Sequence, residues 1–357
     1  MRIERIEAFD LRVPLKRPYH WAGGEIRDLT TIIVTIEAGS RRGAGECTTV
    51  PGYSWEGPAQ AWGFTRQHAP SLVGRSPEEA CRALQRQRHD FPFSVSAYLT
   101  ALEEVLGADA LRPPAEERRL RLLGTVNVDS DNDVRAVVPH LLAAGYTTLK
   151  VKVGFDLEHD IARARLVQSL VEDQARIRFD ANQAYSLDKA RSFAHSVDPA
   201  NVELFEQPFA PDAWDAMVTL ARDCPVPLML DESIFSEKDI DRTHRLGCAH
   251  YIKLKLMKAG SASDLARQIR RVQGHGIGVV LGNGAAADPG CYHEVLVATH
   301  CGVATAGEMN GFLKPRASLL KQSIPVDGPD VVVRPDFRLE PDPLRLHEFA
   351  VAHAVWE

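Results

Sequence analysis

Five short apolar runs in the second half of the chain each end in a charged residue, and they recur at nearly constant intervals. Each run has the composition of a buried strand, and the final residues are Lys152, Asp180, Glu206, Asp231 and Lys255. These charges are 28, 26, 25 and 24 residues apart, which leaves space for one helix between successive strands. Regular alternation of strands and helices predicts a parallel sheet.

The fold class that this alternation favours is α/β, a (β/α)8-type barrel. In such a barrel the carboxyl ends of all strands surround one mouth, which holds the active site. We predict the first strand at 122–128, and the five strands with terminal charges are the second to the sixth. Residues 278–284 and 303–308 are the expected seventh and eighth strands, and 289–300 is the expected seventh helix. The five charged side chains should therefore converge on one site.

The first 120 residues have a different pattern and predict an α+β module. Three strand-like segments are followed by three helical ones, at 3–9, 29–36, 43–46, 55–69, 77–89 and 94–106. The polar, proline-bearing segment 112–118 is the expected linker. We therefore assign residues 1–120 to an N-terminal domain and 121–325 to the barrel. Residues 326–357, with a strand-like run at 331–333, are expected to fold back on the N-terminal domain.

Composition and net charge indicate which binding partners and which cellular location to expect. The 357 residues carry a net charge of −6, with 45% hydrophobic and 25% charged residues, as in ordinary soluble enzymes. A nucleic-acid or anionic-membrane partner would require a basic surface, so neither is expected. The chain has no apolar run of about 18 residues and no secretory apolar core at its N-terminus. Six scattered cysteines without a C-x-x-C motif predict reduced thiols and a cytoplasmic protein.

Three of the strand-terminal charges are carboxylates, and we predict that they bind a metal ion. They are Asp180, Glu206 and Asp231. Carboxylate oxygens suit a hard cation, Mg²⁺ or alternatively Mn²⁺, better than zinc, which prefers nitrogen and sulfur ligands. Asn182, two residues after Asp180, is a predicted supporting residue. Glu232 directly follows Asp231, and strand alternation predicts that its side chain points to the opposite face.

The two lysines at strand ends, Lys152 and Lys255, are the predicted acid and base. Strands two and six lie opposite each other in an eight-stranded barrel, so the two ammonium groups should approach a substrate from opposite sides. A lysine with an ordinary pKa of about 10.4 is protonated at neutral pH. Lys150 and Lys253 each lie two residues earlier on the same strand face. We expect these neighbouring cations, together with the metal, to lower the pKa of Lys152 and of Lys255.

The chain resembles a known family at five motifs that occur in order. They are Lys150-x-Lys152, Asp180-x-Asn182, Glu206-Gln207-Pro208, Asp231-Glu232-Ser233 and Lys255-x-x-Lys258-x-Gly260. The pattern is similar to the enolase superfamily, and within it to the muconate-lactonizing-enzyme branch, which includes o-succinylbenzoate synthases and dipeptide epimerases. The resemblance implies that the N-terminal module is a capping domain whose loops close over the barrel mouth. It also implies a homo-oligomer.

Two strand ends outside the five motifs bear on the substrate. The resemblance implies that an Asp-x-Asp at the end of strand eight holds the substrate ammonium in dipeptide epimerases, whereas this chain has Glu308 and Asn310 there. Asn283 stands at the end of strand seven, where the mandelate-racemase branch would have a His base. We predict that these three residues contact or support the substrate.

Aromatic residues occupy two loops of the N-terminal module. Tyr19 and Trp21 lie beside a Gly-Gly pair, and Tyr53 lies in a second turn. These rings either line the substrate pocket as part of a lid or pack in the core of their own domain.

The residues together indicate an enzyme that removes the proton α to a carboxylate of a small molecule through a metal-stabilised enediolate. Lysines on both faces favour racemisation or epimerisation of an amino-acid-like acid, an N-acyl amino acid or a dipeptide. The enzymic alternative is a muconate-type cycloisomerase or a dehydratase in which one lysine is the base. The non-enzymic alternative is a barrel that binds a ligand without turnover.

Overall fold

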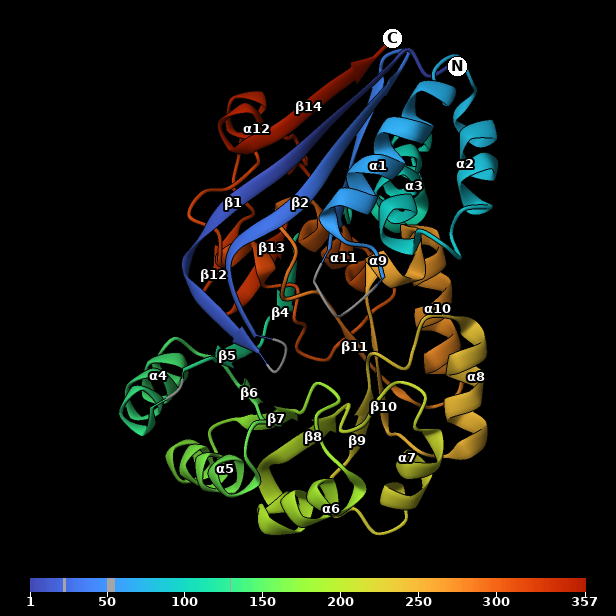
Figure 1. Cartoon of the computed structure of the whole chain (residues 1–357). Helices are drawn as coiled ribbons and strands as arrows, with labels where there is room; N and C mark the ends of the chain where they lie inside the picture. The colour runs from blue at the N-terminus through green and yellow to red at the C-terminus, as the bar shows by residue number, and fades with distance from the viewer. Residues whose placement is uncertain (22–23, 50–54, 129) are drawn as a thin grey trace.

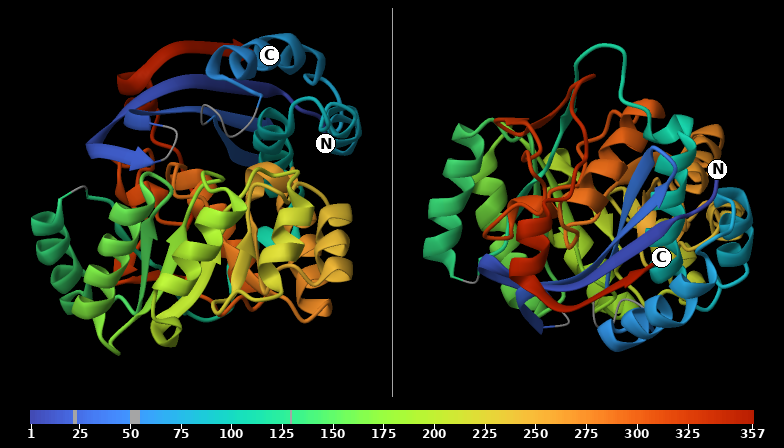
Figure 2. Two further views of the ribbon diagram at one scale, coloured as in Figure 1. Left: turned by 60° about the horizontal axis from the view of Figure 1, so that its bottom comes forward. Right: turned by 90° about the horizontal axis from the view of Figure 1, so that it is seen from above.

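The computed structural model describes residues 1–21, 24–49, 55–128 and 130–357, apart from the side chains of His20 and Trp21. Figure 1 shows two layers, a sheet with helices that includes both chain termini and a larger ring of strands and helices. The side view in Figure 2 shows that the first layer lies across one end of the ring. No described helix is long and apolar enough to span a bilayer, and all six cysteines are free thiols.

The capping layer is an antiparallel sheet with strand order β14-β1-β2-β3, packed against three helices. Its elements are β1 (Arg5–Trp21), β2 (Gly24–Ala38), β3 (Arg41–Thr48), α1 (Pro58–His68), α2 (Pro77–Gln85), α3 (Pro92–Leu106) and β14 (Ala350–Trp356). Gly43 and Gly45 let α3 pack directly on β3, because a Cβ atom there would lie 2.0 Å from Ala101 O and 1.8 Å from Ala97 O. The hairpin of β1 and β2 is longer than predicted.

The ring is a parallel sheet of seven strands, β5 to β11 in sequence order, with helices on its outer face. Its strands are β5 (Gly124–Val126), β6 (Thr148–Lys152), β7 (Arg176–Asp180), β8 (Val202–Glu206), β9 (Leu228–Leu230), β10 (Tyr251–Leu254) and β11 (Gly278–Leu281). The helices are α4 (Asp131–Ala143), α5 (Leu157–Val171), α6 (Leu187–Ser196), α7 (Trp214–Ala221), α8 (Glu237–Leu246), α9 (Leu256–Ala259), α10 (Ala262–Gly274) and α11 (Asp288–His300). Short 3₁₀ helices lie at Ala69–Ser71, Asp109–Leu111, Pro199–Asn201 and Gly311–Leu313.

The prediction of a regular eighth strand at 303–308 is wrong, although this segment does close the ring. Its one bridge pairs Gly307 with Leu122, which precedes β5. On the other side the N–H of Glu308 donates to Leu281 O at 2.9 Å, at the end of β11. Gly282 permits this close approach, since a Cβ atom there would lie 2.5 Å from the backbone of Glu308. The backbone contacts are therefore too few for a ladder but join both edges of the sheet.

The C-terminal segment divides between two sheets. β12 (Val326–Asp327) pairs with β13 (Asp330–Val333), and β13 pairs with β4 (Arg118–Arg121). The prediction that the run at 331–333 folds back on the N-terminal domain is wrong, because the run pairs with β4 instead. Helix α12 (Pro343–Phe349) and β14 do return to the capping layer, where β14 pairs antiparallel with β1. The domain limits at 120 and 325 stay predictions.

Two acids of the capping layer, the buried Glu46 and the half-buried Glu103, bind the first turns of barrel helices. Glu46 of β3 accepts the N–H groups of Ala287 and Gly290, both at 2.7 Å, at the start of α11. Glu103 of α3 accepts the N–H of Ala262 at 2.7 Å, at the start of α10. Carboxylates are favourable at helix N-termini because they satisfy free N–H groups and complement the helix dipole. These bonds fix the capping layer over the barrel mouth.

One ion pair inside the barrel ties three of its strand positions together. Arg178 of β7 is fully buried and donates two parallel hydrogen bonds to Glu203 of β8, at 2.9 Å and 2.8 Å. A third bond, from Arg178 Nη1 to Ala306 O at 2.8 Å, reaches the irregular eighth segment. The pair therefore contributes to barrel closure where the ladder is missing.

We predict that Arg178→Met lowers the free energy of unfolding by about 3 kcal/mol, because it leaves the half-buried carboxylate of Glu203 and a carbonyl without their partner. Chemical denaturation monitored by circular dichroism measures the change. Arg135→Met, at an exposed site on α4, is the matched control and should change the free energy by about 0.5 kcal/mol or less. Equal effects of the two substitutions would contradict the role in closure.

Candidate active site at the barrel mouth

Three carboxylates lie at the carboxyl ends of neighbouring strands. Asp180 and Glu206 are the last residues of β7 and β8 and pair directly in the parallel register. Asp231 follows the last residue of β9. All three are buried. The spacing of the strands along the chain therefore brings these side chains to one edge of the sheet. The capping layer lies across this end of the ring (Figure 2).

Two fully buried lysines lie between these carboxylates. Lys150 Nζ is 2.7 Å from Asp180 Oδ2 and 2.9 Å from Glu206 Oε2. Lys253 Nζ is 3.0 Å from Glu206 Oε1 and 3.9 Å from Asp231 Oδ2. Both ammonium groups also bind the carboxylate of Glu308, on the segment after the eighth strand position. Lys150, Lys253 and Glu308 thus form the floor of the site.

The two lysines at the strand ends, Lys152 and Lys255, lie on two sides of the carboxylate cluster. Lys152 Nζ is 2.6 Å from both Asp180 Oδ2 and Asn182 Oδ1. Lys255 Nζ is 2.8 Å from Asp231 Oδ2. The strands that lead to these residues, β6 and β10, are separated in the sheet by β7, β8 and β9. A small cavity of about 60 Å³ is lined by both lysines and by Asp180 and Asp231.

Strained backbone follows two of the carboxylates. Asn182 has φ 40° and Gln207 has φ 37°, values that cost non-glycine residues about 1–3 kcal/mol each. Local hydrogen bonds hold both residues: the N–H of Asn182 donates to Asp180 Oδ1 at 2.9 Å, and Gln207 Oε1 accepts the N–H of Asp231 at 2.9 Å. The strain therefore accompanies bonds that orient Asp180 and Asp231.

Two residues near Asp231 were not assigned to the site from the sequence. Lys258 is buried and donates to Asp231 O at 2.7 Å and to Asp231 Oδ1 at 2.8 Å. Glu232 accepts from Asn182 Nδ2 at 3.2 Å, so the prediction that it points away from the site is wrong. Strand alternation does not apply because β9 ends at Leu230. The repeated lysine of the Lys255-x-x-Lys258 motif was the available signal for Lys258.

The two strand-end lysines have different pKa values. Burial lowers the pKa of Lys255, and the neighbouring Lys253 and Lys258 lower it further, which together outweigh Asp231. Burial is also the largest influence on Lys152 and lowers its pKa, but Asp180 and the other negative charges nearby together outweigh burial, and the net pKa is raised. The prediction of a lowered pKa is therefore correct for Lys255 and wrong for Lys152. At Lys152 the negative charge of Asp180 raises the pKa by more than the positive charge of Lys150 lowers it.

The carboxylates fit a hard divalent cation in donor type and in burial. Burial would raise the pKa of Asp231, but Lys255 and Lys258 hold it well below its usual range. Asp180 is likewise buried, and Lys150 and Lys152 lower its pKa. Both groups are therefore ionised at neutral pH and can act as ligands. Glu206 is buried as well, and its Oε2 lies 2.9 Å from Lys150 Nζ, so a positive charge already occupies the position beside this oxygen.

The capping layer and the loops after β10 and β11 cover the site. The small cavity is also lined by Tyr19 and Ile26 from the β1–β2 hairpin and by Met257 and Asn283 from the barrel loops. Asn283 is buried; its Nδ2 lies 3.1 Å from Met257 Sδ, and its Oδ1 accepts the N–H of Ala285. Tyr19 and Asn283 therefore both line the pocket, and Asn283 also supports the loop after β11.

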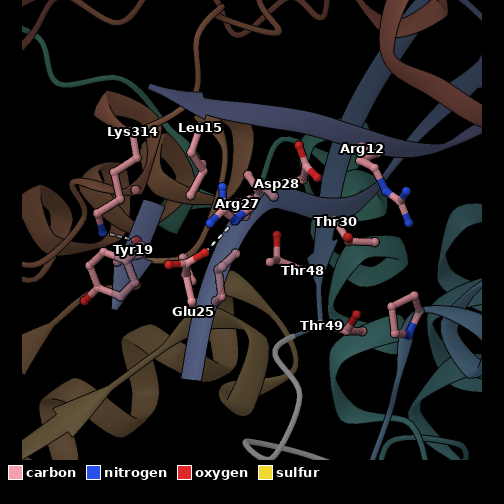
Figure 3. A pocket seen from close by; sticks show the side chains of 16 residues that line it. Arg12, Leu15, Tyr19, Glu25, Arg27, Asp28, Thr30, Thr48, Thr49 and Lys314 are labelled. Carbon is pink, nitrogen blue, oxygen red and sulfur yellow. Dashed lines mark hydrogen bonds and ion pairs between the residues drawn. The ribbon is translucent and has the colours of Figure 1, made fainter. Parts of the chain in front are cut away.

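A larger cavity of about 400 Å³ continues from the small one beneath the capping sheet. Tyr19, Ile26 and the loop at 284–285 line both cavities. Figure 3 shows charged side chains of both signs around the larger space, including a Glu25–Arg27 ion pair of 2.5 Å. Lys314 lies over the ring of Tyr19, at 4.4 Å from its centroid. The pocket between Lys152 and Lys255 is thus continuous with a space large enough for part of a small molecule.

Three other predicted residues lie elsewhere or are not described. Asn310 donates to Leu123 O at 3.2 Å and lines a separate cavity beside β5, so it does not line the lysine pocket. Tyr53 and the side chain of Trp21 lie outside the described residues.

The sequence and the fold agree with known proteins over most of the chain. Residues 133–334 match the family described as Enolase C-terminal domain-like. The N-succinyl-L-Arg/Lys racemase of Bacillus cereus is 25% identical over 332 residues, 88% of each chain. The crystal structure of that racemase superposes with a TM-score of 0.91 and 22% identity over 100% of both chains.

Two further solved structures are similar. A dipeptide epimerase from Cytophaga hutchinsonii, complexed with Mg and the dipeptide D-Ala-L-Val, gives a TM-score of 0.91 at 22% identity over 100% of both chains. A muconate lactonizing enzyme from Pseudomonas fluorescens gives 0.85 at 24% identity over 98% of this chain and 99% of that one. The family match covers more than half of the chain, so this protein belongs to the enolase superfamily and has the fold of its muconate-lactonizing branch.

Glu294, a buried acid that contacts the backbone next to Lys255, is a titratable group not identified from the sequence. Glu294 of α11 accepts the N–H of Leu256, the residue after Lys255, at 2.8 Å. Its second oxygen, Oε2, is buried and accepts no hydrogen bond. Burial raises the pKa of Glu294 to about 8, although the bond from Leu256 opposes the shift. The folded protein therefore holds a proton on this group at neutral pH, where the unfolded chain does not.

We predict that Glu294 makes stability fall as the pH rises from about 4.5 to about 8. Within this window the folded state binds one more proton, so the free energy of unfolding decreases by up to about 1.4 kcal/mol per pH unit. Glu294→Gln should remove this slope and keep the bond to Leu256. Denaturation of both proteins at several pH values measures the difference, and parallel curves would contradict the prediction.

Proposed function

We propose that the protein is a Mg²⁺-dependent racemase of N-acylated amino acids. The observation that carries the proposal is the placement of Lys152 and Lys255 on two sides of one pocket lined by carboxylates. Racemisation at a carbon α to a carboxylate needs a base on one face and an acid on the other. Two lysines separated in this way supply both groups, since each changes role with the enantiomer that is bound.

Asp180, Glu206 and Asp231 are the residues that would hold the metal, with Mn²⁺ as a chemically similar alternative to Mg²⁺. When bound, the ion supplies positive charge that stabilises the negative charge developing on the substrate carboxylate. Glu308 binds both Lys150 and Lys253. Glu308 would therefore remain an oppositely charged partner of Lys150 and Lys253 while Asp180, Glu206 and Asp231 held a cation.

The unequal lysines support a direction for proton transfer. Lys255, whose pKa is lowered chiefly by burial, is the lysine that more readily becomes neutral and can accept a proton. Lys152, whose pKa is raised because Asp180 and other nearby negative charges outweigh burial, stays protonated and can supply one. In the favoured direction Lys255 takes the α proton and Lys152 returns a proton to the opposite face. Asn182 orients Lys152 through the bond of 2.6 Å to its Nζ.

The state of Glu308 favours an acylated amino group over a free ammonium. Its carboxylate is already paired with two buried ammonium groups, Lys150 and Lys253. A third ammonium from a dipeptide would have to compete with both, whereas a neutral amide would not. The similarity to an N-succinyl amino acid racemase over 88% of the chain supports the same choice. The charged lining of the larger cavity, with Glu25 and Arg27, suits a polar or charged substrate end.

The second candidate is a one-base reaction, cycloisomerisation or dehydration. The opposite pKa shifts of Lys152 and Lys255 favour it, because such a reaction needs one neutral lysine and one permanent cation. Similarity to muconate lactonizing enzymes in fold is compatible with this alternative. Isotope exchange separates the two, since a racemase must also produce the opposite enantiomer.

The test is a ¹H NMR screen in D₂O with Mg²⁺, using N-succinyl and N-acetyl derivatives of L-arginine and L-lysine and dipeptides with free amino groups. We predict loss of the α-proton signal and formation of the D-enantiomer for an N-acyl substrate, with slower reaction of the dipeptides. EDTA should abolish both changes, and added Mg²⁺ should restore them, because proton removal depends on metal-stabilised charge.

Asp231→Asn should lower kcat/KM by about 100-fold or more, because it removes a ligand and a partner of two lysines. Asp215→Asn, at an exposed carboxylate of α7, is the matched control and should have the activity of the parent protein. Full activity after exhaustive EDTA treatment would overturn the metal assignment. Exchange without any D-product would favour the one-base alternative.

A further inference from the structure

A cluster of two histidines and a glutamate lies on the capping sheet, at the opposite end of β1 from Tyr19. Glu7 belongs to β1, His353 to β14, and His347 to α12. One ligand atom from each of the three side chains lies within 4.8 Å of the other two. We propose that this cluster binds a divalent transition-metal ion such as Zn²⁺, which fastens the C-terminal segment to the first strand.

The strand register explains why two of the ligands meet. In the antiparallel pair of β1 and β14, Phe9 lies opposite His353, and Glu7 lies opposite Val355. Directly opposed residues share a face of the sheet, and so do residues two positions apart on one strand. Glu7 and His353 are therefore diagonal neighbours on the same face. Their atoms Oε1 and Nε2 are 2.9 Å apart.

Helix α12 brings the third ligand to this face. Its Leu346 is buried in the same hydrophobic cluster as Phe9, which anchors the helix on β1. The next residue, His347, contacts the Phe9 ring edge-on, with ring centroids 5.0 Å apart. His353 stacks on the same ring at 4.4 Å, and the two imidazole centroids are 4.9 Å apart. Phe9 thus restricts the orientation of both imidazoles before any ion binds.

The donor set selects the class of metal. Two imidazole nitrogens and one carboxylate oxygen suit Zn²⁺ and similar first-row ions, whereas Mg²⁺ prefers oxygen ligands alone. Ligand atoms around a tetrahedral Zn²⁺ are about 3.4 Å apart, given bonds of about 2.1 Å. The cluster therefore needs only small side-chain rotations to close around an ion.

A cation beside the cluster positions Glu7. Arg5 Nη2 lies 3.2 Å from Glu7 Oε2, so it binds the oxygen that faces away from His353 and leaves Oε1 directed at the histidine. Three protein ligands leave one coordination position open to solvent, because all three side chains are at least partly exposed. The ion would connect β1, β14 and α12, which meet here although about 340 residues separate the two strands in the sequence.

The test is a Zn²⁺ titration of the full chain with a competing chromophoric chelator, in excess Mg²⁺ and in the Asp231→Asn background. This background weakens the barrel carboxylates, so Zn²⁺ bound there is not counted. We predict one Zn²⁺ per chain and a rise in melting temperature on binding, because the ion binds the folded state alone. His347→Ala and Glu7→Gln should each weaken binding by at least about tenfold, and the double variant should show no rise in melting temperature with Zn²⁺.

His159→Ala, at an exposed histidine of α5, is the matched control and should retain the affinity of its parent. Melting of each variant without Zn²⁺ shows that it is folded. A site that is unchanged in His347→Ala and Glu7→Gln, or no saturable Zn²⁺ binding in the Asp231→Asn protein, would overturn the proposal. A cobalt(II) absorption spectrum typical of nitrogen and oxygen ligands, lost in His347→Ala, would support it.

Discussion

The site at the barrel mouth depends on the pairing of buried positive and negative side chains. Five lysines face four carboxylates there: Lys150, Lys152, Lys253, Lys255 and Lys258, with Asp180, Glu206, Asp231 and Glu308. A buried charge without a partner costs several kcal/mol. Each of these nine groups accordingly has an oppositely charged neighbour within 3.0 Å.

The rest of the fold holds this network in place. Parallel register sets the ends of β6, β7 and β8 side by side, which aligns Lys152, Asp180 and Glu206. From the other side, Glu46 and Glu103 bind the first turns of α11 and α10, so the capping layer stays above the mouth. Glu294 of α11 in turn binds the backbone beside Lys255. The position of Lys255, one of the two proposed acid–base residues, is therefore linked to the contact between the capping layer and the barrel.

Much of this arrangement could be predicted from the sequence because strand periodicity and strand-end charges are local signals. They predicted the strands ending at Lys152, Asp180 and Glu206 and the convergence of their side chains. The irregular closure at Gly307 could not be predicted, since it depends on contacts with Leu122 and Leu281 that are distant in the chain.

The same distinction applies to charge and orientation within the site. The raised pKa of Lys152 depends on how closely Asp180 approaches, a distance that no sequence pattern contains. The orientation of Glu232 depends on β9 ending at Leu230, one residue earlier than Asp231, and strand ends are the least predictable part of an element. The cluster of Glu7, His347 and His353 could not be found from the sequence, because its residues come together only through the pairing of β1 with β14.

In the proposed reaction, Lys152 and Lys255 act on opposite faces of one substrate carbon. The most direct test measures α-proton exchange in D₂O for Lys152→Ala and Lys255→Ala, with each enantiomer of the N-acyl substrate supplied separately. Two-base racemisation predicts that both variants lose net conversion, while each still exchanges the α proton of the one enantiomer that faces its remaining lysine. Loss of exchange in one variant alone, whichever enantiomer is supplied, would contradict the account.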